Sequence, residues 1–179
     1  MRKKILIAVA FVVAAFVVFV SLRPSDFRVE RSINIAAPAS AVFVQVNNFH
    51  NWDAWSPWAR LDPKAKLTLE GPAEGIGAIY SWDGNSDVGA GRMTLTDSQV
   101  NALVRIKLEL FKPFTATNTT EFSFKSEGAE THVSWSMTGQ NNFIAKLMGL
   151  FMDCDKMIGG DFEKGLQQMK TLSEGLAKK

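Results

Sequence analysis

The chain has 179 residues, with 20 Lys and Arg against 18 Asp and Glu, so its formal net charge is +2. Residues 1–23 contain four of the basic residues and none of the acidic ones, which leaves residues 24–179 with a net charge of −2. This balance excludes the basic footprint of a nucleic-acid-binding protein, and the single cysteine, Cys154, excludes an internal disulfide and a cysteine-rich metal site.

An apolar run near the N-terminus, residues 5–22, is interrupted only by Ser21. At about 1.5 Å per helical residue it reaches roughly 27 Å, close to the thickness of the hydrocarbon core of a bilayer. We therefore expect residues 1–23 to form a single N-terminal membrane anchor. A cleavable signal peptide is the alternative, although its apolar region is usually shorter. The basic cluster at residues 2–4 favours a cytoplasmic N-terminus, with residues 24–179 as one extracytoplasmic domain.

The domain begins with a strand and two short helical segments. Residues 27–35 alternate between apolar and polar side chains, as a strand does. Pro38 suits the start of a helix, which we expect over residues 41–46. A second helical segment is expected within residues 51–58, where Pro57 limits it to about one or two turns.

From residue 65 the pattern predicts strands separated by turn residues. The expected strands are 67–69, 78–82, 91–97, 100–110, 114–125 and 132–138. From residue 143 to residue 172 the apolar period is helical, and Gly159-Gly160 predicts a break or a close approach of this helix to the sheet. This order is typical of an α+β domain in which one antiparallel sheet carries its helices on one face, with a pocket between the sheet and the long C-terminal helix.

Several segments resemble the START-like superfamily, and most closely the bacterial polyketide cyclase/dehydrase and lipid transport group, also called SRPBCC proteins. The segments that carry the resemblance are Arg31-Ser32-Ile33, Ala37-Pro38-Ala39, Asn51-Trp52, Trp55-Ser56-Pro57-Trp58, the last strand at 133–139 and the helix at 155–166. The resemblance covers residues 27–172 and implies the helix-grip (Bet v 1-like) fold, a strongly curved antiparallel sheet gripping a long C-terminal helix. It leaves the function open, because this fold hosts both binders and enzymes.

Our leading hypothesis is a membrane-anchored domain that binds a hydrophobic small molecule, lipid- or isoprenoid-like. Trp52, Trp55 and Trp58 recur every third residue, and they either pack in the core or line the pocket. Asn118 and Thr120 share the inward face of their strand, so they either bind a polar head group or lie at a bulge or an exposed end. The expected ligand-binding residues are Trp55, Tyr80, Trp82, Met93, Asn118, Thr120, Trp135, Met137, Met157 and Phe162.

Two other functions stay open: an interaction module without a ligand, and an enzyme of the cyclase or dehydrase type. The sequence shows no catalytic set, because His50 and His132 have no evident nucleophile or carboxylate partner. Cys154 is interpreted as a small buried residue, and neither a metal site nor a cofactor is expected. The enzyme hypothesis would use Asp53, Tyr80 and Arg92.

Overall fold

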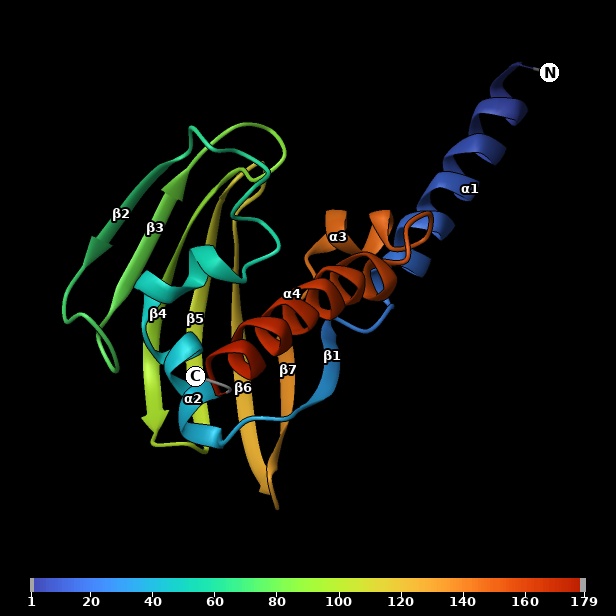
Figure 1. Ribbon diagram of the computed structural model, residues 1–179. Coiled ribbons are helices and arrows are strands. Elements are labelled where there is room, and N and C mark those ends of the chain that lie inside the picture. The colour runs from blue at the N-terminus through green and yellow to red at the C-terminus, as the bar shows by residue number, and fades with distance from the viewer. Residues whose placement is uncertain (1, 178–179) are drawn as a thin grey trace.

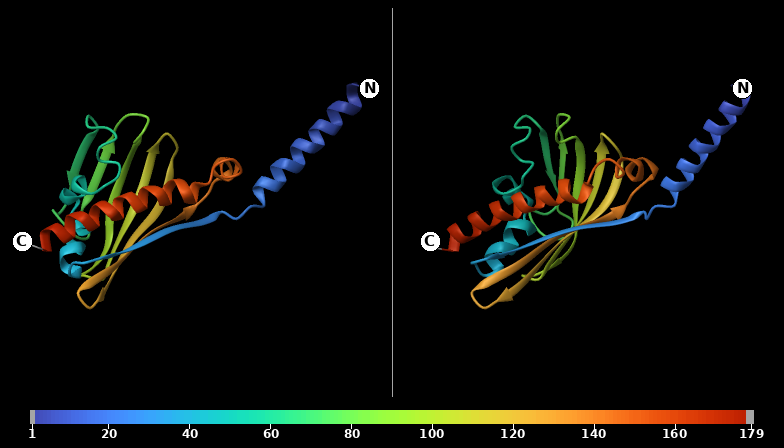
Figure 2. Two further views of the ribbon diagram at one scale, coloured as in Figure 1. Left: turned by 45° about the vertical axis from the view of Figure 1, so that its right-hand side comes forward. Right: turned by 90° about the vertical axis from the view of Figure 1, so that its right-hand side faces the viewer.

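The computed structural model describes residues 2–177 (Figure 1). Helix α1 (Arg2–Ser21) projects from the rest of the molecule, and its side chains are exposed except for that of Val20 (Figure 2). Because residues 5–20 are continuously apolar, α1 is the one helix among the described residues that is long and apolar enough to cross a membrane. One seven-stranded sheet and the remaining helices follow it.

Seven strands form one antiparallel sheet, in the order β1-β7-β6-β5-β4-β3-β2. The strands are β1 (Asp26–Ile35), β2 (Lys66–Glu70), β3 (Ile79–Asp83), β4 (Ala90–Gln99), β5 (Leu103–Lys112), β6 (Ala116–Glu127) and β7 (Glu130–Gln140). Alternation of side chains explains their burial: in β6, Thr120, Phe122 and Phe124 face inward while Thr119 and Ser123 are exposed. The sheet is strongly curved (Figure 2).

The helices of the domain gather on the concave face of this sheet. They are α2 (Ala39–Asn47), the 3-10 helix η1 (Phe49–Ala54), α3 (Phe143–Met148) and α4 (Cys154–Ala177). Helix α4 runs across the sheet, and α3 lies beside the C-terminal end of α1 (Figure 1). This confirms the predicted α+β helix-grip fold, with a curved antiparallel sheet holding a long C-terminal helix.

The helical region after β7 is divided at a different place from the predicted one. Helix α4 passes through Gly159-Gly160 without a break, and the interruption lies at residues 149–153 instead. Two side chains explain the division. The backbone N–H of Ala145 donates to Asn142 Oδ1 (2.9 Å), and that of Lys156 donates to Asp153 Oδ1 (3.1 Å). A side-chain acceptor of this kind starts a helix, so α3 and α4 begin separately.

Gly159 provides the close approach to the sheet that was the other expectation. The guanidinium of Arg31, on β1, lies against this glycine, and a Cβ at position 159 would collide with it. From there Arg31 forms ion pairs with Asp155 (2.9 Å) and Glu163 (2.8 Å), two acidic residues of α4. These pairs raise the pKa of Arg31. The glycine thus lets β1 hold the N-terminal half of α4 by charge.

Two further expectations are wrong. Cys154 is exposed rather than buried, because it begins α4, whose first turn lies outside the surface that contacts the sheet. The strand expected from residue 100 begins at Leu103, because residues 100–102 form the turn before β5, with Asn101 at a φ of 58°.

The hydrophobic core occupies one end of the concave face. Side chains of α2 and the C-terminal half of α4, such as Val42, Val46, Leu166 and Met169, pack there against the sheet and are almost fully buried. The other end of the face, towards α3 and the β5–β6 turn, is not filled in the same way. That end holds a cavity.

Candidate ligand-binding site

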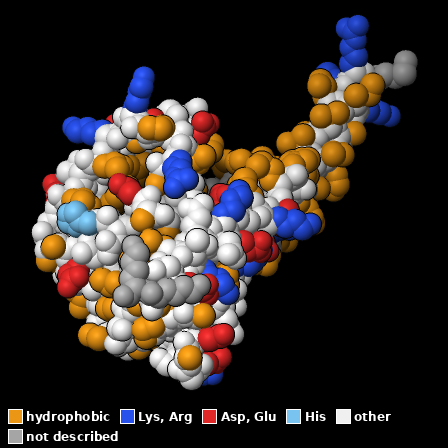
Figure 3. All heavy atoms as spheres, in the orientation of Figure 1, with side chains coloured by type: hydrophobic (Ala, Val, Ile, Leu, Met, Phe, Trp, Pro, Cys, Tyr) orange, Lys and Arg blue, Asp and Glu red, His pale blue; other side chains and the backbone are white. Residues whose placement is uncertain are grey.

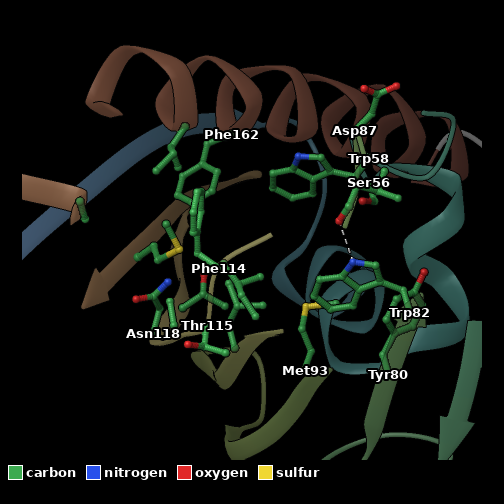
Figure 4. A pocket seen from close by; sticks show the side chains of 18 of the residues that line it. Ser56, Trp58, Tyr80, Trp82, Asp87, Met93, Phe114, Thr115, Asn118 and Phe162 are labelled. Atoms are coloured by element: carbon green, nitrogen blue, oxygen red, sulfur yellow. Dashed lines mark hydrogen bonds between the residues drawn. The ribbon is translucent and has the colours of Figure 1, made fainter. Parts of the chain in front are cut away.

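A cavity of about 570 Å³ lies between the concave face of the sheet and the N-terminal half of α4 (Figure 4). Phe162 reaches into it from α4, while Tyr80, Trp82 and Met93 come from β3 and β4 on the opposite side (Figure 4). Apolar side chains form most of its wall. Eight of the ten predicted ligand-binding residues line this cavity: Tyr80, Trp82, Met93, Asn118, Thr120, Trp135, Met137 and Phe162.

A stack of aromatic rings forms the wall beneath α4. The ring of Trp135 is stacked between Phe162 (centroids 4.0 Å apart, planes 9° apart) and Phe122 (4.7 Å, 27°). Trp58 meets the edge of Trp135 at 5.9 Å and also lines the cavity. These ring contacts orient the indole of Trp135, which presents an apolar surface to the cavity.

The sequence left open whether the tryptophans after α2 pack in the core or line the pocket, and the structure shows both. The indole N–H groups of Trp52 and Trp55 donate to the backbone carbonyls of Val46 (3.0 Å) and Gln45 (2.9 Å). Trp52 still touches the cavity, but Trp55 is fully buried behind Trp135 and Phe122 and does not line it. The prediction of Trp55 as a lining residue is therefore wrong, because its side chain is used for packing.

Met157 is the second predicted lining residue that lies elsewhere. Its side chain is 53% exposed on the outer surface of α4. The cavity is lined instead by Ile158 and Phe162, one turn apart on the face of α4 that meets the sheet. Met157 precedes Ile158 by one residue, which places it about 100° around the helix.

Two inward-facing polar residues of β6 have different surroundings. The indole N–H of Trp135 donates to Thr120 Oγ1 (2.9 Å), and this hydroxyl donates to the carbonyl of Ser136 (2.9 Å). Thr120 therefore has both of its partners within the protein. Asn118 is only 8% exposed and lies over Gly139 on β7, where a Cβ would collide with it. Within residues 2–177, its side-chain amide has no hydrogen-bond partner, so it can bind a polar group in the cavity.

Trp82 and Tyr80 give the wall on β3. The indole N–H of Trp82 donates to the carbonyl of Val88 (2.9 Å), and its ring lies over Gly91, where no side chain stands in the way. Burial raises the pKa of Tyr80 to about 12, with a further contribution from the negative charge of Asp53. At neutral pH the phenol is therefore protonated, so it is a hydrogen-bond donor rather than a base.

The structure does not bring the three residues of the enzyme hypothesis together. Arg92 follows Gly91 on β4 and is exposed on the convex face, opposite to Met93 and Tyr80. His50 is exposed and His132 is half-buried, and their rings pair with the side chains of Asn48 and Asn34. Among the described residues, no three His, Cys, Asp or Glu side chains gather closely enough to hold a metal ion.

Sequence reasoning did not find the residues at the mouth of the cavity. These residues come from α3 and the β5–β6 turn, and they are Phe114, Thr115, Ile144, Ala145 and Met148. The segment 143–148 was interpreted as the first part of the long helix, in which it would not lie at a cavity mouth. Asn142 and Asp153 were the available signals, because both residue types favour the start of a helix.

A curved antiparallel sheet, a helix across it and an apolar cavity between them define a helix-grip protein of the Bet v 1-like class. The chain belongs to the polyketide cyclase / dehydrase and lipid transport family, whose model matches residues 26–174. No curated protein sequence matches it.

Solved structures agree on this class. The Aha1 dimer from Colwellia psychrerythraea is 14% identical, with a TM-score of 0.60 over 83% of this chain and 96% of that one. Major latex-like protein 151 from Panax ginseng is 11% identical, with a TM-score of 0.59 over 83% and 97%. StfQ, a di-domain ARO/CYC protein of the steffimycin biosynthetic pathway, is 11% identical, with a TM-score of 0.62 over 87% of this chain and 53% of that one. At these identities the likeness shows the fold.

Proposed function

We propose that this protein is a membrane-anchored domain that binds one hydrophobic small molecule, of lipid or isoprenoid type, in the cavity between the sheet and α4. The cavity is the observation that carries the proposal. Its volume of about 570 Å³ and its largely apolar wall are those of a small-molecule site. Each Å² of apolar ligand surface that leaves water would contribute roughly 25 cal/mol to binding. The lipid transport part of the family description supports the same ligand class.

The polar and apolar residues of the wall have separate roles in this proposal. Trp82, Met93 and Met137 contact the apolar body of the ligand, and the flexible methionines adapt to its shape. Asn118 binds its polar end, because this residue is only 8% exposed, lines the cavity and has no side-chain hydrogen bond among the described residues. Thr120 does not contribute a hydrogen bond to the ligand, since Trp135 and Ser136 already occupy its hydroxyl.

The contact between α1 and the domain supports an anchor that remains attached. Val20 is fully buried, and Lys146 Nζ, on α3, donates to the carbonyl of Ser21 at the end of α1 (3.1 Å). The basic cluster at residues 2–4 favours a cytoplasmic N-terminus, which places residues 24–179 on the extracytoplasmic side. In that position the cavity stands beside the membrane in which apolar ligands dissolve.

The test is native mass spectrometry of the full chain in detergent, followed by organic extraction of what it carries. A discrete added mass is expected, and Leu108→Trp should remove it, because Leu108 points into the cavity from β5. Lys107→Trp is the matched control, since the preceding residue is exposed on the other face of the strand. Near-UV circular dichroism checks that both variants fold.

A chain that remains ligand-free after incubation with a total lipid extract would overturn the proposal and favour an interaction module. An added mass that both variants retain would place the ligand outside this cavity.

A further inference from the structure

Exposed apolar side chains gather at one end of the domain, around α3. On most soluble proteins such contiguous patches are small, and larger ones mark sites of interaction with proteins or membranes. Phe151 is the extreme case, with 81% of its surface exposed. We call this group the apolar rim; its members are Phe114, Phe143, Ile144, Met148, Phe151 and Met152.

The apolar rim lies next to the point where α1 ends. Helix α1 contacts α3. Three of the rim residues belong to α3, and Phe151 and Met152 lie in the short segment that follows it. Lys146 is the single charged residue between 141 and 152, and its ammonium group donates to the carbonyl of Ser21, the last residue of α1. Figure 3 shows the hydrophobic surface of α1 continuing onto the adjoining part of the domain. The apolar rim and the apolar helix thus form one surface.

The cavity opens within the same surface. Phe114, Ile144 and Met148 line the cavity and are also exposed to the outside, so they form both its mouth and part of the apolar rim. A molecule that enters or leaves between the β5–β6 turn and α3 therefore passes between apolar side chains. In water, such a mouth would expose the ligand and the rim together.

We propose that the apolar rim inserts into the surface of the bilayer that α1 crosses, so that the cavity opens directly onto the lipid. The inference rests on the membrane anchoring and ligand class proposed above. The occupant is the outer part of that bilayer, because α1 ends beside the rim and holds it there at high effective concentration. Amphipathic segments bind membranes by burying apolar side chains of this kind at the head-group boundary. The ligand is accordingly a lipid that exchanges between cavity and bilayer without crossing water.

Spin labels on the full chain in phosphatidylcholine–phosphatidylglycerol liposomes test the position of the rim. Cys154→Ser removes the single native thiol, and labels are attached after Phe114→Cys, Phe151→Cys, Val13→Cys or Val100→Cys. Val100 is the matched control, an exposed apolar residue (78%) in the β4–β5 turn, away from α1. Labels at 114, 151 and 13 should be relaxed by oxygen and protected from a water-soluble nickel complex, and the label at 100 should show the reverse.

The outcomes distinguish the insertion of the apolar rim from the membrane anchoring by α1. If the labels at 114 and 151 are as open to nickel as the label at 100 while the label at 13 is protected, the rim is not in the bilayer and this inference is overturned, although the anchor stands. A label at 13 that is open to nickel would overturn the anchor and the docking together.

The exchange route has its own measurement. The double variant Phe151→Asp/Met152→Asp changes two residues of the apolar rim that do not line the cavity. It should load lipid from vesicles more slowly than the unchanged chain, yet carry the same bound mass when loaded in detergent. Equal loading rates would overturn the route through the rim. If the unchanged chain itself carries no bound lipid after loading in detergent, the proposed ligand class is overturned instead.

Discussion

Thr120→Val tests whether the hydrogen-bond chain from Trp135 through Thr120 to Ser136 holds the cavity wall. Valine keeps the branched shape of threonine, so strand preference changes little. The substitution leaves the buried indole N–H of Trp135 without its acceptor, because Trp135 is 2% exposed. A buried donor without a partner costs about 1–3 kcal/mol, and burying the added methyl group returns up to about 0.8 kcal/mol. We therefore expect a net loss of about 1–2 kcal/mol in the free energy of unfolding.

The assay is urea unfolding of the full chain in a mild detergent, followed by near-UV circular dichroism, which reports on the packing of the tryptophans. Thr119→Val is the control, since the neighbouring threonine is exposed on the other face of β6. Its effect should remain within about 0.5 kcal/mol, as for most surface substitutions. Equal effects of the two substitutions, or no effect of Thr120→Val, would refute the reasoning that the hydroxyl is needed by Trp135.

Three further changes have defined outcomes. Gly165→Ala brings a Cβ to 2.8 Å from the ring of Trp135, and this overpacking should lower the free energy of unfolding by about 1–2 kcal/mol. Gly160→Ala, which has open space around it, should raise the free energy of unfolding by up to about 1 kcal/mol. Stabilisation by both substitutions would contradict this reasoning. Tyr80 is the single tyrosine, so the ultraviolet absorbance of tyrosinate should appear near pH 12 in the folded chain and near pH 10 after unfolding. Because the unfolded state releases this proton first, the free energy of unfolding should decrease as the pH rises from about 10 to about 12, and a midpoint near 10 in the folded chain would exclude the burial of the phenol. Asn118→Leu should weaken binding of a ligand with a polar end by about two- to tenfold in a titration, and unchanged affinity would exclude the amide as a ligand contact.

The strands could be predicted because their alternation is simple. Residues 118–124 of β6 and 131–135 of β7 bury every second side chain, and each face of a sheet has one environment. The pattern also placed Asn118 and Thr120 on the inward face. It did not distinguish the two, because the residues that they contact come from β7, and the register of β7 is set by the whole sheet. Asn118 lies over Gly139, whereas Thr120 accepts a hydrogen bond from Trp135.

The helical parts were harder to predict, for local reasons. Trp55 and Trp58 have the same spacing and chemistry, but Trp55 lies in the core, bonded to the carbonyl of Gln45 and covered by Phe122 and Trp135. Met157 and Ile158 are adjacent apolar residues, and periodicity that tolerates steps of three or four does not choose between them. The residues at the cavity mouth were missed because α3 and α4 begin separately, at Asn142 and Asp153. The apolar period that runs from residue 143 to residue 172 concealed these two helix starts.

Because the core and the cavity occupy opposite ends of one sheet, the domain should open unevenly. A cavity deprives its walls of partner atoms, whereas Val42, Val46, Leu166 and Met169 are packed on all sides at the far end. Local opening costs least where buried contacts are few. Amide hydrogens of α3 and the β5–β6 turn should thus exchange with solvent well before those of α2. The cavity mouth can therefore open locally to admit a ligand while the packed core at the other end of the sheet remains folded.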